Sequence, residues 1–233
     1  MRPRPPRLTA LDAVLFDAGG TLIELDYAFM AERARRHGVA LDPHGLRRAE
    51  GAARRQIDRR ALRRGGVEGT DEGRRFRYFA TLLEAAGVAG GRAAPIVEDL
   101  EAAHAADSLW RVEVAGAAVT LAAIRARGLT TGVISNADGR VASILARAGL
   151  APHLTLIVDS HVEGVEKPDP EIFARALARL RIDPGRAVYV GDIYAIDALG
   201  ARAAGLTPVL LDPLGSYPDV DCATIASLSE LLG

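Results

Sequence analysis

Five short apolar runs constrain the fold of this chain more than any other feature. They fall at residues 13–16, 130–134, 154–158, 187–190 and 207–211, and they lack the alternation of a strand with one wet face. Such runs are typical of parallel strands that helices cover on both faces. Helical patterns separate the later runs, at residues 117–127, 139–148, 170–180 and 195–204, and we expect a final helix at 223–232. This alternation predicts an α/β fold, a doubly wound parallel sheet in a Rossmann-like three-layer core.

A long insertion separates the first apolar run from the second. Residues 26–105 have helical patterns without convincing strands, and glycines near 65–66, 69 and 87–91 divide them into about four helices. We therefore predict a core built from residues 11–25 and 106–233, and a helical domain formed by residues 26–105. Residues 1–10 are basic and proline-rich without the apolar centre of a secretion signal, so they are expected to be a flexible tail.

Composition excludes several classes of protein. No apolar run reaches the roughly 18 residues that span a bilayer, so no membrane association is expected. The single cysteine, Cys222, fits a reducing compartment and predicts a cytoplasmic location.

Residues 28–77 hold fourteen arginines against seven acidic residues, which is either a solvated helical face or an attraction for an anionic substrate. Nucleic-acid binding is not expected because aromatic side chains for base stacking are scarce there. The oligomeric state cannot be inferred.

Polar side chains follow the apolar runs where each predicted strand ends. They are Asp17 after the first run, Ser135 and Asn136 after the second, Lys167 after the third, and Asp192 and Asp197 after the fourth. Taken singly, each is explained as a helix cap, a turn residue or a surface charge. Open α/β sheets bind ligands at the carboxyl ends of their strands, so the conjunction of these residues predicts a site there.

Lys167 is also the only lysine among 29 basic residues. Arginine serves wherever a generic cation is enough, so a retained lysine indicates a need for a compact ammonium group.

These segments resemble, in order, the four sequence motifs of the haloacid dehalogenase superfamily. The matching stretches are FDAGGTL, SNAD, the lysine of EKPDPEIF, and VGDIYAID. The insertion is similar to the all-helical cap domain of that superfamily. The resemblance implies a Mg²⁺-dependent hydrolase, and most specifically a phosphatase that acts on a small, anionic, phosphorylated metabolite through an aspartyl-phosphate intermediate.

The resemblance also implies a role for each motif residue. Asp17 is the expected nucleophile, and Lys167 pairs with it and with the phosphoryl oxygens. Asp17, the carbonyl of Gly19 and Asp192 are the expected metal ligands, which agrees with the preference of Mg²⁺ for oxygen. The substrate-binding residues are expected to be Thr21, Ser135 and Asn136, and Asp197 is expected to act behind the metal ligands.

Gly19 departs from the phosphatase pattern, in which a second aspartate lies two residues after the nucleophile. That aspartate acts as the general acid and base, a role commonly worth about 10² to 10⁴ in rate. Another group, such as His37, His44 or His104, could supply the proton, or the substrate could have a good leaving group. Two alternatives remain: a 2-haloacid dehalogenase-like hydrolase, which also lacks that aspartate, and a catalytically weak phosphate-binding protein. The Gly191-Asp192 pair favours metal-dependent phosphoryl chemistry over dehalogenation.

Overall fold

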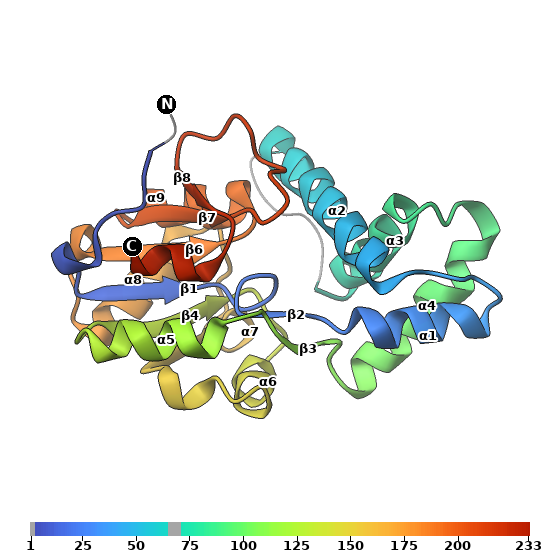
Figure 1. Cartoon of the computed structure of the whole chain (residues 1–233), viewed down its shortest axis with the longest axis horizontal. Helices are drawn as coiled ribbons and strands as arrows, with labels where there is room; N and C mark the ends of the chain where they lie inside the picture. Colours follow the sequence, from blue (N-terminus) through green and yellow to red (C-terminus); the bar gives the residue numbers. More distant parts are fainter. Residues whose placement is uncertain (1–2, 65–70) are drawn as a thin grey trace. The chain divides into compact units, whose positions relative to one another are not determined.

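A computed structural model describes the backbone of residues 3–64 and 71–233, with the side chains of those residues other than 64 and 71–77. The chain divides into two compact units. The first, the core unit, consists of Met1–Glu24 and Arg111–Gly233, and the second, the helical unit, consists of Leu25–Trp110. The two units are drawn in Figure 1 with the colours following the sequence.

The core unit contains the predicted parallel sheet. Its strand order is β5-β4-β1-β6-β7-β8, and every adjacent pair is parallel. The strands are β1 (Ala13–Phe16), β4 (Thr130–Ser135), β5 (Leu156–Asp159), β6 (Ala187–Gly191), β7 (Thr207–Leu211) and β8 (Ala223–Ile225). The first apolar run is thus a central strand with β4 and β6 as its neighbours, as Figure 1 also shows. The predicted doubly wound fold is confirmed.

Helices cover the sheet and explain why its strands are continuously apolar. The core-unit helices are α5 (Ala117–Ala126), α6 (Val141–Arg147), α7 (Ser160–Glu163), α8 (Pro170–Leu180) and α9 (Leu199–Ala203). On one face, Ile172, Phe173 and Ala176 of α8 pack with Leu15 of β1 and Tyr189 of β6. All four residues of β1 are buried. This central strand therefore has no solvent-exposed side, which removes the alternation.

The start of α8 is fixed by local sequence signals. The side chain of Asp169 accepts a hydrogen bond from the backbone N–H of Glu171, and Pro170 occupies the first helical turn. An aspartate cap followed by proline is a strong helix start, because the cap satisfies an otherwise unpaired N–H and proline needs no partner there. The loop immediately before this start carries Lys167, so the cap fixes where that loop ends.

The C-terminal segment corrects one prediction. Residues 223–232 do not form a helix: Ala223–Ile225 is the edge strand β8, paired with β7, and Leu228–Leu232 is a 3-10 turn. Thr224 and Ile225 are β-branched and favour a strand. Ser227 and Glu230 then form a capping box, which restarts a helical turn instead of continuing one.

Short elements account for the other differences from expectation. Residues 195–204 begin as a π-helical turn, Tyr194–Ala198, before α9. The strands β2 (Ile23–Leu25) and β3 (Trp110–Glu113) form a separate two-stranded sheet, and they are too short to give a sequence signal. Further 3-10 turns lie at Leu8–Ala10, Ala151–His153 and Pro184–Arg186. Arg202 of α9 forms an ion pair with Asp221 in the segment before β8.

The helical unit has its own apolar core. Its helices are α1 (Tyr27–Arg36), α2 (Pro43–Arg64), α3 (Asp71–Ala85) and α4 (Ala93–Ala106), with a 3-10 turn at Gly90–Arg92. Met30, Leu46, Phe79, Leu82 and Leu100 are among the fully buried side chains between them. The helices are interrupted near Gly87, as expected, whereas the interruptions expected at 65–66 and 69 lie outside the described residues. Among the helices that the structure describes, none combines the length and apolarity needed to cross a bilayer.

Candidate active site

The candidate site lies at the carboxyl ends of three neighbouring strands in the core unit. Phe16, the last residue of β1, is level with Val133 of β4 and with Val190 of β6. Asp17 follows β1 directly, and Gly191 and Asp192 lie at the end of β6. These residues therefore lie at the same edge of the sheet. The backbone N–H of Asp17 still donates to the carbonyl of Val190 at 2.8 Å, which ties the start of this loop to β6.

Lys167 lies at the centre of the hydrogen-bond network of the site. Its Nζ atom donates to Asp17 Oδ1 at 2.7 Å, to Asp197 Oδ1 at 2.7 Å and to Tyr189 Oη at 2.8 Å. The side chain is only 2% exposed. An ammonium group has three N–H donors, so each of its protons has an acceptor within short hydrogen-bonding distance. The arrangement neutralises a buried cation with two carboxylates, which is the condition for keeping such charges out of water.

Asp197 joins the ammonium group to the loop that carries Asp192. While its Oδ1 accepts from Lys167, its Oδ2 accepts from the backbone N–H of Asp192 at 3.1 Å and of Ile193 at 2.9 Å. The π-helical turn around Asp197 folds the side chain back over its own N-terminal loop. A Cβ atom at Gly191 would lie 2.3 Å from Cγ of Asp197. Glycine is therefore required where the carboxylate crosses the strand end.

Three carboxylates form a group able to hold a metal ion. Among the described residues, Asp17, Asp192 and Asp197 each have an oxygen within 4.8 Å of the others, and all three are buried. Both oxygens of Asp197 already accept hydrogen bonds, whereas the second oxygen of Asp17 lies outside the Lys167 contact. An all-oxygen donor set suits a hard divalent cation.

Burial and charge shift the pKa values of these groups in opposing ways. Burial raises the pKa of the Asp17 carboxyl above its ordinary value, and the neighbouring Lys167 ammonium works against that rise. Burial alone would lower the pKa of Lys167, but the carboxylates of Asp17 and Asp197 outweigh it, so the net pKa is raised. The lysine is thus held firmly in its charged form, as an electrostatic partner for a carboxylate nucleophile needs.

Asn136 is tied to the backbone of Lys167. Its Nδ2 donates to the Lys167 carbonyl at 2.8 Å, and its Oδ1 accepts from the Lys167 N–H at 2.8 Å. The carboxamide therefore holds the backbone of this loop at two points. Ser135 ends β4 beside it and is 5% exposed.

The loop after Asp17 contains a buried hydroxyl group with unused hydrogen-bonding capacity. The Thr21 side chain is fully buried, and its Oγ1 has no hydrogen-bond partner among the described residues. A buried hydroxyl without a partner is costly, so its presence indicates a site that a ligand completes. The adjacent Gly20 has a φ of 84°, a left-handed conformation that favours glycine, whereas Gly19 is outside that region.

Tyr189 is the site residue that sequence reasoning missed. It lies on β6 among apolar neighbours and is fully buried. Its hydroxyl donates to the carbonyl of Ile134 at 2.7 Å and accepts from Lys167. The signal that could have found it is a hydroxyl group within an otherwise apolar central strand, since a buried tyrosine needs a polar partner.

Two histidines of the helical unit, His104 and His37, have local structural contacts. His104 is buried, its Nδ1 accepts from the backbone N–H of Leu109 at 3.2 Å, and its ring lies 5.8 Å from that of Phe79. His37 lies 3.2 Å from a carboxylate oxygen of Asp99, which also pairs with Arg33. His44 is exposed near the start of α2. Packing inside the unit therefore accounts for His104 without a catalytic role.

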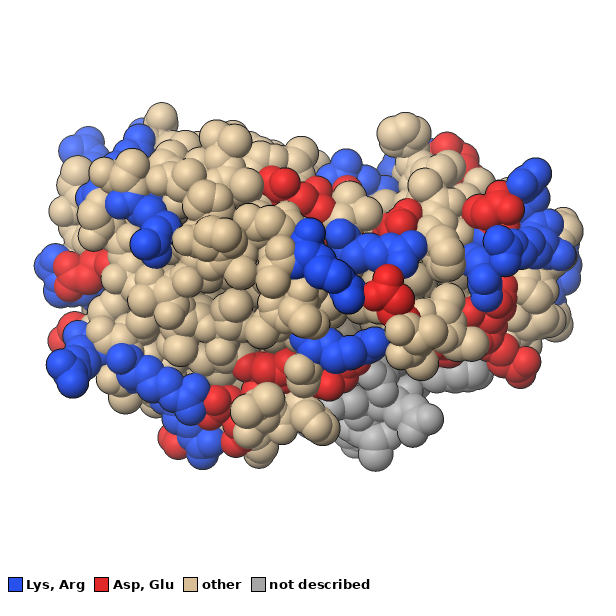
Figure 2. Space-filling view, turned by 90° about the horizontal axis from the view of Figure 1, so that it is seen from below, with Lys and Arg blue, Asp and Glu red and all other residues tan. Residues whose placement is uncertain are grey.

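The arginine-rich insertion is partly neutralised by its own acids. Arg54 pairs with the buried Glu50 and Arg55 with the buried Asp58. In the view of Figure 2, basic side chains (blue) and acidic side chains (red) lie close to one another on the helical unit. These pairings neutralise two of the arginines within the helical unit.

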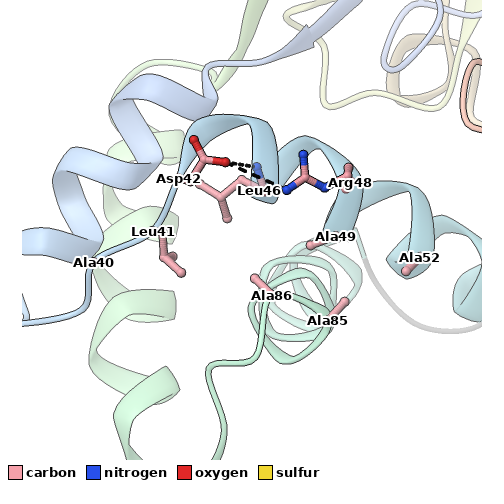
Figure 3. A pocket seen from close by; sticks show the side chains of 10 residues that line it. Ala40, Leu41, Asp42, Leu46, Arg48, Ala49, Ala52, Ala85 and Ala86 are labelled. Carbon is pink, nitrogen blue, oxygen red and sulfur yellow. Dashed lines mark hydrogen bonds and ion pairs between the residues drawn. The ribbon is translucent and has the colours of Figure 1, made fainter.

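A hollow in the helical unit is lined mostly by small apolar side chains. It has a volume of about 450 Å³ and lies between the start of α2 and the end of α3. Figure 3 shows small apolar side chains such as Ala49 and Ala86 facing it, with Asp42 and Arg48 at its edge. Those two charges lie 3.9 Å apart, and the same oxygen of Asp42 accepts a 2.7 Å hydrogen bond from the backbone N–H of Gly45. A lining of this kind, with one carboxylate and one guanidinium at its edge, offers few groups for nucleophilic or acid-base chemistry.

Comparisons with known proteins agree with this arrangement. A sequence model of a hydrolase family, the haloacid dehalogenase-like hydrolases, matches residues 11–205. The haloacid dehalogenase-like hydrolase domain-containing protein 3 of Bos taurus is 32% identical, over 95% of this chain and 92% of its own. The ribulose-1,5-bisphosphate 5-phosphatase of Halopiger xanaduensis is 31% identical, over 86% of this chain and 84% of its own.

A solved structure is also similar over nearly the whole length. The 2-haloacid dehalogenase from Pseudomonas syringae pv. Tomato DC3000 is 27% identical and superposes with a TM-score of 0.56. The similarity covers 95% of this chain and 96% of that one.

Proposed function

The chain belongs to the haloacid dehalogenase-like hydrolases, and we propose that within this family it is a Mg²⁺-dependent phosphatase that uses Asp17 as a covalent nucleophile. Its substrate would be a small, anionic phosphate ester or anhydride. The phosphatase from Halopiger xanaduensis, similar over most of its length, supports phosphoryl transfer as the chemistry.

The observation that carries the proposal is the arrangement of charges around Asp17. One oxygen of Asp17 accepts from a buried lysine, and a second carboxylate from the neighbouring strand, Asp192, lies within 4.8 Å. Phosphoryl transfer requires this kind of fixed electrostatic environment, because charge develops on the transferring group and its oxygens.

The donor chemistry fits a divalent cation. Asp17 and Asp192 would hold it, together with the carbonyl of Gly19, while the commitment of Asp197 to three N–H donors supports a role behind the ligands. A bound Mg²⁺ would neutralise negative charge on the transferring phosphoryl group. The unused Thr21 hydroxyl, with Ser135 and the backbone of Asn136, would bind the phosphoryl oxygens.

The chain's own residues would then act in two steps. An Asp17 carboxylate oxygen attacks phosphorus, the bond to the leaving-group oxygen breaks, and an aspartyl-phosphate forms. Water next attacks the phosphorus, which releases inorganic phosphate and restores the carboxylate. Lys167 stays charged throughout and balances Asp17 when it is ionised. Gly19 offers no proton to the leaving group, so the first step should depend on how easily that group departs.

One observation favours a second candidate, a 2-haloacid dehalogenase. Halide leaves without a proton, so Gly19 would be no handicap, and the Pseudomonas syringae dehalogenase is similar across the chain. Asp192 weighs against it, because a second carboxylate beside Asp17 suits a metal-dependent reaction better than the displacement of halide from an anionic acid.

A substrate screen separates the two candidates. The protein is incubated with aryl, acyl and alkyl phosphates and with 2-haloacids, each with Mg²⁺ and with a chelator. We expect phosphate release that requires Mg²⁺ and that Asp17→Asn abolishes. Halide release in the presence of chelator, without phosphate release from any ester, would instead assign the dehalogenase reaction.

A further inference from the structure

Tyr189 supplies the third acceptor around the Lys167 ammonium group. The other two acceptors are carboxylates with expected roles, Asp17 and Asp197, whereas the tyrosine belongs to none of the motifs that identify the family. We propose that Tyr189 is a positioning residue: its hydroxyl oxygen fixes the direction of the Lys167 ammonium group and thereby the place of that charge beside Asp17. This inference rests on the proposed function for its catalytic consequence, but not for its geometry.

The hydroxyl of Tyr189 is oriented as an acceptor toward the lysine. A phenol has a single proton, and here it lies in a 2.7 Å hydrogen bond to the backbone carbonyl of Ile134. That carbonyl belongs to β4 and cannot move without the sheet. The oxygen lone pairs are left to face Lys167 Nζ at 2.8 Å. A contact of 3.4 Å to Asp197 is too long to compete for the same proton.

The tyrosine ring is itself held in place. Phe173 of α8 packs edge-on against it, with ring centroids 4.9 Å apart and an interplanar angle of 84°. Both side chains are fully buried. Rigid packing of this kind keeps the Tyr189 hydroxyl in one position, and catalysis is sensitive to small displacements of a charged group.

A third acceptor completes the hydrogen bonding of the buried ammonium group. With the two carboxylates alone, one buried N–H has no acceptor, and the ammonium group gains by turning toward whatever other acceptor it can reach. The tyrosine oxygen satisfies the third N–H and so holds the ammonium group in this orientation. Because it is neutral, it does so without adding a third negative charge that would compete with an incoming phosphoryl group.

The single lysine makes the inference directly observable. Labelling the protein with lysine carrying ¹⁵N at Nζ gives one ammonium signal, and it belongs to Lys167 without further assignment. Buried, hydrogen-bonded protons exchange slowly with water, so this signal should be visible at neutral pH in the metal-free protein.

The test compares Tyr189→Phe with a matched control, Tyr194→Phe. Tyr194 also donates a 2.7 Å hydrogen bond, but to Asp221, away from the lysine. We expect Tyr189→Phe to speed exchange of the Lys167 ammonium protons at least about tenfold, because a bond to a charged group is commonly worth that factor or more. With an active substrate, kcat should fall by about 10- to 100-fold with KM within about twofold. Tyr194→Phe should change neither the exchange rate of the Lys167 ammonium protons nor kcat.

Unchanged ammonium exchange in a folded Tyr189→Phe variant would overturn the inference. If that variant does not fold, the wild-type protein still decides: cross-relaxation between the Lys167 ammonium protons and the Tyr189 ring is expected, and its absence would refute the contact. If the proposed function is wrong, the wild-type protein will release no phosphate, but Tyr189→Phe will still speed exchange of the Lys167 ammonium protons. The two failures are therefore distinguishable.

Discussion

Replacing Asp197 by asparagine tests the hydrogen-bond pattern of the site with a change of one atom. The wild-type carboxylate accepts from Lys167 Nζ on one oxygen and from two backbone N–H groups on the other. Asparagine keeps only one acceptor oxygen. In one orientation its NH₂ group faces the ammonium, and in the flipped orientation it faces the two backbone donors, so every orientation opposes donor to donor.

The magnitude follows from the less costly orientation. Keeping the two backbone bonds forfeits one charge-assisted bond, worth about 1.5–3 kcal/mol, and leaves the buried Lys167 with a single carboxylate. Breaking a buried charge pair costs about 3–5 kcal/mol. We expect Asp197→Asn to lower the free energy of unfolding by about 3 kcal/mol, and the melting temperature of the core unit by about 12 °C.

Urea unfolding followed by circular dichroism measures this difference, with Asp169→Asn as the matched control. Asp169 caps α8 through one oxygen and is exposed. Asparagine caps helices about as well as aspartate, so the control should stay within about 0.5 kcal/mol of the wild type. If Asp197→Asn were as stable as Asp169→Asn, the Asp197 carboxylate would not be holding Lys167 and the two backbone N–H groups as we describe.

Three further predictions concern a close contact, the missing acid and pH. Gly191→Ala should destabilise the core unit by about 3 kcal/mol or more, because its Cβ would fall 2.3 Å from Asp197 Cγ; Gly91→Ala, with open space at its Cβ, should change the unfolding midpoint little. Gly19→Asp should raise alkyl-phosphate turnover by about tenfold or more relative to aryl phosphates, since the φ of Gly19 lies outside the left-handed region; unchanged relative rates would mean that another group already donates the proton. Hydrogen bonding to an arginine of α9 lowers the pKa of Asp221 from 3.8 to about 2, so the stabilisation is complete above pH 4 and is lost as pH falls toward 2. Because that pair is exposed, Asp221→Asn should cost only about 0.5 kcal/mol at pH 7 and progressively less as the pH falls below 4, as unfolding at a series of pH values will show.

Elements with strong local signals were predictable from the sequence. The runs at β1 and β7 coincide with the observed strands, and α8 coincides from its Pro170 start to Leu180, because burial on both faces and an Asp-Pro cap leave marks in a few consecutive residues. The final segment was predicted wrongly. Its apolar residues fit a helix as well as a strand, and pairing with β7, a tertiary contact, decides between them.

The charged residues of the site were predictable from the sequence, but the residues that position them were not. Carboxylates and a lysine at strand ends are visible along the sequence. By contrast, Tyr189 contributes through an atom that meets Lys167, 22 residues away, and Asn136 meets the backbone of Lys167 across 31 residues. No local pattern encodes such meetings, because they depend on how the sheet aligns β4, β6 and the loop before α8.

The central claim is that a phosphoryl group passes through Asp17. The direct measurement is to quench the protein with acid during turnover of an aryl phosphate with Mg²⁺, digest it, and locate the phosphoryl group by peptide mass spectrometry. We predict that the phosphoryl group is on Asp17 in the wild type, accumulates further when hydrolysis is slow, and is absent from Asp17→Asn. Phosphate release from an Asp17→Asn variant at the wild-type rate, or a phosphoryl group trapped only on another residue, would contradict the account.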